Sequence, residues 1–239
     1  MSNSRNAWQG MSLPKRIDKT AQILHKRYRD FAHHNRKNPL EELLFIICSV
    51  QTQESNYRRT FAALRRAFPR FDDLAAASAR AIAKPLKPGG LSPTKSKAIR
   101  KICSGIQVQF GKVTLGPLQM MNSEECETFL TSLPGVGAKV ARCVMMYSLG
   151  REVFPVDTHC WRICQRLGWI RCTSKNGVCS RHDMDRLQEK IPLRVRFSLH
   201  VNLISLGREF CRARNPRCPE CPLAFMCKTA SRRGRNPDG

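Results

Sequence analysis

A chain of 239 residues is long enough for one large or two small domains, and its 41% hydrophobic content excludes a disordered basic tail. Forty-two Lys and Arg residues against 18 Asp and Glu give a formal net charge of +24, which predicts a polyanionic partner, nucleic acid above all. No apolar run approaches the roughly 20 residues that span a membrane, and we expect no signal peptide. The 12 cysteines are then expected in a reducing compartment, without disulfides.

Apolar side chains recur at helical spacing along most of the chain, and no pair of segments alternates as strands do. We therefore predict an all-α fold. The predicted helices cover 14–32, 40–50, 56–67, short pieces within 71–83, 95–110, 125–132, 138–149, a helix that opens at Asp157, 181–190 and 195–210. The remaining segments include a polar leader over 1–13, a Pro- and Gly-rich loop over 84–94 and a polar loop over 170–180.

One connection between two predicted helices is rich in residues that end a helix. Pro134, Gly135 and Gly137 cannot continue the helix that ends near Ser132. Glycine lets backbone N–H groups crowd around a phosphate, and the helix over 138–149 presents its positive end at the same place. The plain alternative is a turn without a ligand. As a functional element, the segment predicts a phosphate-binding hairpin.

Two charged residues follow this hairpin in a pattern suited to nucleophilic chemistry. Lys139 lies in the first helical turn, where the helix dipole disfavours a cation and so favours the neutral amine that a nucleophile needs. Asp157 comes 18 positions later and opens the next apolar helix. An aspartate in such a place is usually only a cap. The combination of hairpin, amine and carboxylate predicts a catalytic pair.

The sequence LPGVGAKVA (133–141) with FPVDTH (154–159) resembles the helix-hairpin-helix DNA glycosylases of the endonuclease III type. The resemblance implies that Lys139 is the nucleophile, that Asp157 assists it, and that Gly135, Val136 and Gly137 bind DNA. It implies a bifunctional base-excision repair enzyme, an N-glycosylase and AP lyase. Such an enzyme removes damaged bases, above all oxidised pyrimidines, from double-stranded DNA through a lysine Schiff base, and it also acts on abasic sites.

The same resemblance implies a domain organisation and a cellular setting. Two helical domains flank a DNA-binding cleft: a six-helix barrel-like domain over 34–129, and an iron–sulphur cluster domain over 14–33 and 130–239. We expect a monomer without membrane association. Its location would be the cytoplasm or nucleoid of a prokaryote, or the nucleus of a eukaryote.

Four cysteines near the end of the chain share the spacing C-x6-C-x2-C-x5-C: Cys211, Cys218, Cys221 and Cys227. Thiolates this close point to one metal centre, and the spacing alone leaves zinc and an iron–sulphur cluster open. The resemblance implies the [4Fe–4S] loop of endonuclease III-like enzymes, with an architectural role. Arg212 and Arg214 lie inside the loop and are predicted to contact DNA phosphates; a solvated basic loop is the alternative.

The front half of the chain carries a further part of the resemblance. The stretch from Asn38-Pro39 to Gln51 resembles the N-P-x-E…S-x-Q segment of the family, which implies that Gln51 fills the space left by an extruded base. Leu91 matches the wedge leucine of the family. The related adenine-specific mismatch glycosylase has a catalytic glutamate about five residues before the glutamine. This chain has Ile46 there, which disfavours that activity.

Other readings remain open at this point. The segment FPVDTHCWRICQRLGW (154–169) also resembles plant 5-methylcytosine glycosylases, so the target base is not fixed. A non-catalytic helix-hairpin-helix protein would keep the hairpin and the charge, although the presence of both Lys139 and Asp157 argues against it. A zinc-dependent DNA binder would keep the four cysteines.

Overall fold

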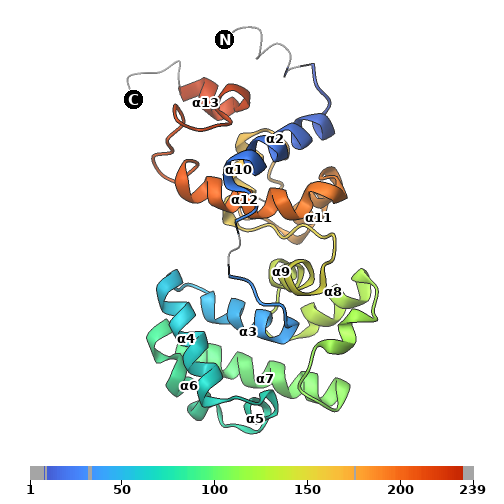
Figure 1. Cartoon of the computed structure of the whole chain (residues 1–239), viewed down its shortest axis with the longest axis vertical. Coiled ribbons are helices and arrows are strands. Elements are labelled where there is room, and N and C mark those ends of the chain that lie inside the picture. Colours follow the sequence, from blue (N-terminus) through green and yellow to red (C-terminus); the bar gives the residue numbers. More distant parts are fainter. Residues whose placement is uncertain (1–7, 9, 32–33, 175, 234–239) are drawn as a thin grey trace. The chain divides into compact units, whose positions relative to one another are not determined.

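The computed structural model describes residues 8, 10–31, 34–174 and 176–233. Within these ranges every regular element is a helix, which confirms the predicted all-α fold (Figure 1). The α-helices are α2 (Leu13–Tyr28), α3 (Pro39–Ser49), α4 (Glu54–Ala67), α5 (Phe71–Ala76), α6 (Ala79–Leu86), α7 (Ser92–Phe110), α8 (Ser123–Ser132), α9 (Ala138–Leu149), α10 (Thr158–Arg166), α11 (Arg181–Lys190), α12 (Arg196–Glu209) and α13 (Lys228–Arg233). Short 3-10 helices are η1 (Lys87–Gly89), η2 (Gly116–Gln119), η3 (Leu193–Val195) and η4 (Ala224–Met226). No helix in the described ranges is long and apolar enough to cross a bilayer.

The chain forms two compact units. We call residues His34–Arg151 the central unit, and Met1–His33 together with Glu152–Gly239 the terminal unit. The predicted boundary after residue 129 differs from this division, because it assigned 130–151 to the cluster domain. The reason is packing: α9 lies against α3 and α8, so the hairpin belongs to the central unit.

The core of the central unit is built around α3. Seven consecutive residues of this helix, 42–48, are buried, as its almost wholly apolar sequence predicts. The helix begins after Asn38, whose side-chain oxygen accepts hydrogen bonds from the N–H groups of Leu40 (3.0 Å) and Glu41 (3.1 Å). Helices α4, α7 and α9 pack on α3. On one side the ring of Phe45 meets Phe61 of α4 edge-on at 5.3 Å.

The loop predicted over 84–94 is shorter in the structure. Helix α6 continues to Leu86, η1 follows directly, and α7 already begins at Ser92. The prediction interpreted the prolines as loop residues. Pro93 instead lies in the first turn of α7, where a missing N–H group removes no helical hydrogen bond. Only Gly90 and Leu91 separate η1 from α7, so this connection is tight rather than extended.

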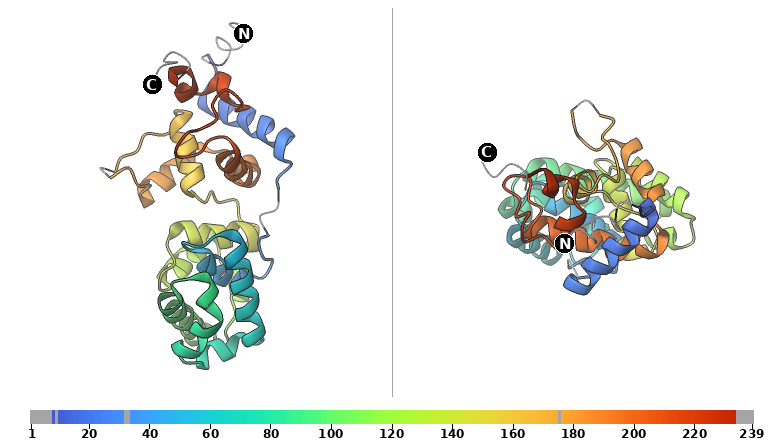
Figure 2. Two further views of the ribbon diagram at one scale, coloured as in Figure 1. Left: turned by 90° about the vertical axis from the view of Figure 1, so that its left-hand side faces the viewer. Right: turned by 90° about the horizontal axis from the view of Figure 1, so that it is seen from above.

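The terminal unit packs α2 and α10 against α12, as both Figure 1 and Figure 2 show. The helix predicted over 14–32 ends at Tyr28, because Arg29 and Asp30 adopt φ of 51° and 54°. Most of the predicted polar leader lies outside the described residues. Trp8 is an exception and is buried, with its ring edge-on to Phe225 at 6.3 Å.

Candidate functional site

The predicted phosphate-binding hairpin connects α8 to α9 through residues 133–137. Leu133 and Val136 are buried and anchor it, and the Val136 N–H donates to the Leu133 carbonyl at 3.1 Å. The Val136 side chain and N–H are thus both engaged within the hairpin, and its predicted contact with DNA stays a prediction. The exposed residues of the hairpin are Pro134, Gly135 and Gly137.

The two glycines of this hairpin differ in backbone conformation. Gly135 has φ of +78°, which side-chain-bearing residues rarely adopt. Gly137 has φ of −87°, which any residue tolerates, and a Cβ atom there would meet nothing within 4 Å. The fold would therefore accept a residue with a side chain at position 137. An open backbone ahead of the first hydrogen bond of α9, from Ala141 N–H to Gly137 O, suits a bound phosphate.

Lys139 is half-buried in the first turn of α9. Helix α9 packs on α3, and the charge of Lys139 acts on Glu42, which is fully buried on α3. The Glu42 carboxylate accepts hydrogen bonds from Asn35 Nδ2 and the Arg36 N–H, both at 2.6 Å. Burial raises the pKa of Glu42, an effect that these hydrogen bonds and the charge of Lys139 reduce.

Sequence reasoning missed Glu42. It lies at the start of the buried run 42–48, whose other residues are apolar, and an acidic residue in such a run is the signal that could have identified it.

The two residues predicted to enter the duplex, Gln51 and Leu91, both lie in the central unit. Gln51 follows α3 and Leu91 precedes α7, and both side chains are exposed. Their backbones adopt φ of 51° and 50°, in the left-handed region that residues other than glycine enter at a cost. Two exposed side chains on strained backbone are a pattern often associated with function.

Asp157 lies in the terminal unit and caps α10, as predicted. Its Oδ1 accepts a hydrogen bond from the Cys160 N–H at 2.7 Å. Burial by itself would raise the pKa of Asp157, but the charge of His200 and the Cys160 N–H outweigh it and hold this pKa below its ordinary value. The carboxyl group is therefore ionised at neutral pH.

Sequence reasoning also missed His200. Its ring is buried edge-on to Phe154 at 5.9 Å, and its Nδ1 lies 3.5 Å from the Cys160 Sγ. It comes from α12, so no local pattern in the sequence links it to Asp157.

Helix α10 connects Asp157 to the four-cysteine loop. Arg162 donates from Nε to the Cys211 carbonyl at 2.9 Å. Arg166, one turn later, donates from Nη1 to the Cys211 Sγ at 3.1 Å and to the Arg212 carbonyl at 2.8 Å. Because these hydrogen bonds join α10 to the start of the loop, the loop is held by side chains from outside it.

The four cysteine side chains of the loop influence one another electrostatically. Burial raises the pKa of Cys221 to about 11, and the neighbouring thiols of Cys211, Cys227 and Cys218 act in the same direction. A metal that binds several thiols reverses this effect by deprotonating them. In the described ranges, no three His, Cys, Asp or Glu side chains lie as close together as ligands of one ion do.

The arginines of this loop divide into two kinds. Arg212 and Arg214 are exposed, as a phosphate contact requires. Arg217 instead forms an ion pair with Glu220 and lies 5.6 Å from the centre of the Phe210 ring. The central unit therefore holds the hairpin, Lys139, Gln51 and Leu91, whereas the terminal unit holds Asp157, the four cysteines, Arg212 and Arg214.

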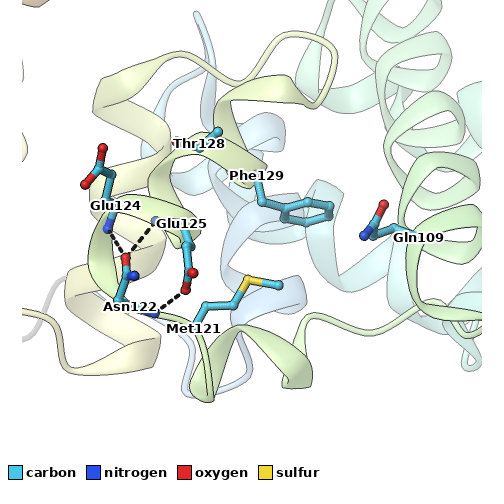
Figure 3. A pocket seen from close by; sticks show the side chains of 7 residues that line it. All are labelled: Gln109, Met121, Asn122, Glu124, Glu125, Thr128 and Phe129. Atoms are coloured by element: carbon cyan, nitrogen blue, oxygen red, sulfur yellow. Dashed lines mark hydrogen bonds between the residues drawn. The ribbon is translucent and has the colours of Figure 1, made fainter.

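A pocket of the central unit lies between the end of α7 and the start of α8 (Figure 3). None of the predicted site residues lines it; its lining residues are Gln109, Met121, Asn122, Glu124, Glu125, Thr128 and Phe129. Asn122 and Glu125 form the capping box of α8, so the polar groups of the pocket stabilise the fold.

Comparison with known proteins agrees with the geometry. Residues 44–187 match the HhH-GPD superfamily of base excision DNA repair proteins, and residues 211–227 match the iron–sulphur binding domain of endonuclease III. The second match begins at Cys211 and ends at Cys227. The chain therefore carries the [4Fe–4S] cluster of this domain.

Individual relatives support the same assignment. Endonuclease III of Bacillus subtilis is 31% identical over 198 residues, which span 83% of this chain and 84% of that protein. An Arabidopsis thaliana protein named as a DNA glycosylase is 36% identical over 169 residues, 71% of this chain. These residues span only 56% of the plant protein.

A solved structure of a trapped endonuclease III–DNA covalent intermediate superimposes with a TM-score of 0.76 at 25% identity, and covers 94% of this chain and all of that one. The chain thus belongs to the HhH-GPD superfamily of base excision DNA repair proteins, as an endonuclease III-like DNA glycosylase.

Proposed function

We propose that this protein is a bifunctional glycosylase and AP lyase that removes oxidised pyrimidine bases from duplex DNA, through a Schiff base on Lys139. The observation that carries the proposal is the position of Lys139, which directly follows an open glycine hairpin at the positive end of α9. The solved relative that was trapped as a covalent intermediate with DNA supports the covalent route.

The proposed reaction begins with phosphate binding and base extrusion. The backbone N–H groups at Gly135 and Gly137, with Arg212 and Arg214, bind phosphates, while Gln51 and Leu91 occupy the space that the base leaves. The neutral Lys139 amine then attacks C1′ with its electron pair. The C1′–N glycosidic bond breaks, and the base departs with the bonding electrons and takes up a proton.

Strand cleavage follows from the same lysine adduct. The adduct loses one proton, and its nitrogen electron pair then expels the ring oxygen O4′, which takes up a proton; breaking of the C1′–O4′ bond gives a protonated Schiff base at C1′. Removal of a C2′ proton then expels the 3′ phosphate by β-elimination, and water releases the lysine. Asp157, held as a carboxylate, stabilises the positive charge that develops on the sugar while the glycosidic bond breaks.

Cys211, Cys218, Cys221 and Cys227 are the proposed ligands of the [4Fe–4S] cluster. When bound, the cluster supplies four sulphur bonds that fix the loop in place. Arg162 and Arg166 hold the same loop from α10, so Arg212 and Arg214 reach phosphate from a rigid support.

Borohydride trapping tests the lysine. The wild-type protein should form a covalent adduct with abasic or thymine-glycol duplex DNA, because borohydride reduces the imine to a stable amine. Lys139→Gln should form none. Lys112→Gln removes the same charge from an exposed position and should retain the adduct. An undiminished adduct in Lys139→Gln contradicts the proposed nucleophile.

The carboxylate is tested by separating DNA binding from turnover. Asp157→Asn should bind an abasic-site duplex like the wild type and release bases about a hundredfold more slowly. Asp73→Asn, an exposed change in α5, is the matched control and should keep the full rate. A full rate in Asp157→Asn would remove the carboxylate from the mechanism.

A panel of lesions addresses the target base. Base release and nicking are assayed separately on duplexes that contain thymine glycol, 5-methylcytosine or an abasic site. Preferential release of oxidised pyrimidines supports the proposal. Preferential release of 5-methylcytosine would instead place the chain with the plant enzymes that its segment 154–169 resembles.

A further inference from the structure

Lys95 is a buried cation that neither the resemblance nor the proposed reaction uses. It lies in the first turn of α7 and is only 4% exposed. Its Nζ donates three hydrogen bonds: to the Cys48 carbonyl (2.9 Å), the Thr52 Oγ1 (2.7 Å) and the Gly89 carbonyl (3.1 Å). All three donor sites of the ammonium group are thus satisfied by neutral oxygens.

These three acceptors belong to two segments that are far apart in the sequence, the end of α3 with the loop after it, and η1. Cys48 and Thr52 lie on either side of Gln51, and Gly89 lies two residues before Leu91. The Thr52 hydroxyl also donates to the Gly89 carbonyl at 2.6 Å, so the two segments bind each other as well as Lys95. The hydrogen bonds therefore join the backbones that carry Gln51 and Leu91.

The electrostatic setting explains why a charged residue occupies this place. The Cys48 carbonyl belongs to the last turn of α3, where a cation is favourable because the helix dipole is negative at that end. Burial lowers the pKa of Lys95, so the ammonium group depends on its three acceptors. Lys95 thus caps α3 and fixes the loop that follows it.

A second contact fixes the other loop. A Cβ atom at Gly89 would lie 2.7 Å from the Thr60 Oγ1, so η1 is seated closely on α4 at that point. Gln51 and Leu91 themselves keep left-handed backbone conformations that a free loop would leave. The surrounding hydrogen bonds and contacts are what maintain these conformations.

We propose that Lys95 is a positioning residue that holds the Gln51 loop and the Leu91 loop as one preformed element for opening the DNA duplex. The proposal rests on the proposed function, in which both side chains enter the duplex. A preformed element loses less conformational freedom on binding than two separate loops do, so the lysine lowers the barrier to base extrusion without touching DNA.

The test compares a step that needs duplex opening with one that does not. Lys95→Met keeps the length of the side chain and removes its donors. We expect base release from a thymine-glycol duplex to fall about tenfold to a hundredfold. Cleavage of a single-stranded oligonucleotide with a preformed abasic site should stay near the wild-type rate. Lys97→Met, an exposed change two residues later, is the matched control.

Fluorescence of 2-aminopurine placed opposite an abasic site reports duplex opening directly. The wild type should raise it, whereas Lys95→Met should raise it less, as should Gln51→Ala and Leu91→Ala. Full duplex opening by Lys95→Met, or equal losses on both substrates, overturns the proposal. A wild-type protein that releases no base from any lesion overturns the proposed function instead.

Because removal of a buried cation can unfold a protein, a milder variant accompanies this test. Thr52→Val removes the hydroxyl that bridges Lys95 and Gly89 and leaves the two carbonyl acceptors in place. If Lys95→Met does not fold, Thr52→Val decides the question. A selective loss on the duplex substrate supports the proposal, and unchanged duplex opening contradicts it.

Discussion

The two units hold their functional loops by different means. In the central unit, a buried lysine satisfied by carbonyl and hydroxyl oxygens joins the Gln51 and Leu91 loops to an apolar core built on α3. In the terminal unit, Arg162 and Arg166 reach from α10 to a loop in which Leu223 and Met226 are the only fully buried residues. A loop that is attached to an apolar core can keep strained backbone conformations. A loop with few buried residues of its own depends on hydrogen bonds from neighbouring elements.

Loss of the cluster should give the largest effect and should separate the two units. Cys218→Ser is expected to remove visible absorption and to destabilise the terminal unit by more than the roughly 3 kcal/mol of a deleted core side chain. Hydrogen exchange should rise in α2, α10 and α12 and stay slow in α3 and α7. Cys172→Ser, outside the loop, is the control. Equal loss of protection in both units would contradict the comparison.

Two helical glycines, one in each unit, provide the next test. A Cβ atom at Gly207 in α12 would lie 2.4 Å from the His159 Nδ1, so Gly207→Ala should lower the free energy of unfolding by about 1–3 kcal/mol. In α7 a Cβ atom at Gly105 meets only Leu133, at 3.7 Å. Gly105→Ala should therefore stabilise the protein by up to about 1 kcal/mol. Denaturant titration of both variants checks the signs.

Substitution of the two hairpin glycines should affect different properties of the protein. Gly135→Ala should cost about 1 kcal/mol of stability because of its positive φ. Gly137→Ala should leave stability nearly unchanged and weaken binding to an abasic-site duplex about tenfold, or about 1.4 kcal/mol. Thermal unfolding and fluorescence anisotropy measure the two quantities. If Gly137→Ala binds DNA normally, the open backbone there has no role in phosphate binding.

The smallest expected effect is on the pH dependence of stability, for which we compare one carboxyl group from each unit. The pKa of Asp157 is lowered, so its stabilising contribution is present at neutral pH and is lost as the pH falls through its folded-state pKa. The pKa of Glu42 is raised, so ionisation destabilises the fold as the pH rises above about 4.

Relative to the wild type at pH 7, Asp157→Asn should therefore unfold at a lower temperature and Glu42→Gln at a higher one. The Glu42→Gln difference should shrink as the pH falls toward about 4, where wild-type Glu42 becomes protonated, whereas the Asp157→Asn difference should shrink only as the pH falls further. Scanning calorimetry from pH 3 to pH 7 checks both trends. Equal signs for the two variants would contradict the assigned environments.

The sequence predicts the elements of this fold well, because local signals define them. The predicted helices over 138–149 and 181–190 agree with α9 and α11, since Gly137 and Ser180 precede the two helices and their polar and apolar residues follow helical spacing. The family resemblance identified the glycosylase superfamily and the cluster from motifs that are contiguous in the chain.

The sequence does not reveal contacts between segments that lie far apart in the chain. The two compact units differ from the predicted domain boundary after residue 129, because the contact of α9 with α3 joins segments about a hundred residues apart. From the sequence alone, Lys95 would be taken for an ordinary surface lysine, because its hydrogen-bond acceptors at Cys48 and Gly89 are known only from the structure. The burial of Val136 within the hairpin is likewise not visible in the sequence.

Helix α10 has a mechanical consequence. Its nine residues span about 14 Å, with Asp157 at one end and Arg166 at the other, bonded to the sulphur and backbone of the cysteine loop. Because the helix moves as one rigid element, we expect a displacement of the cysteine loop at Arg166 to move the Asp157 carboxylate at the other end. Loss of the cluster is therefore expected to slow the proposed reaction by displacing Asp157, although no residue of the cysteine loop takes part in the proposed bond breaking.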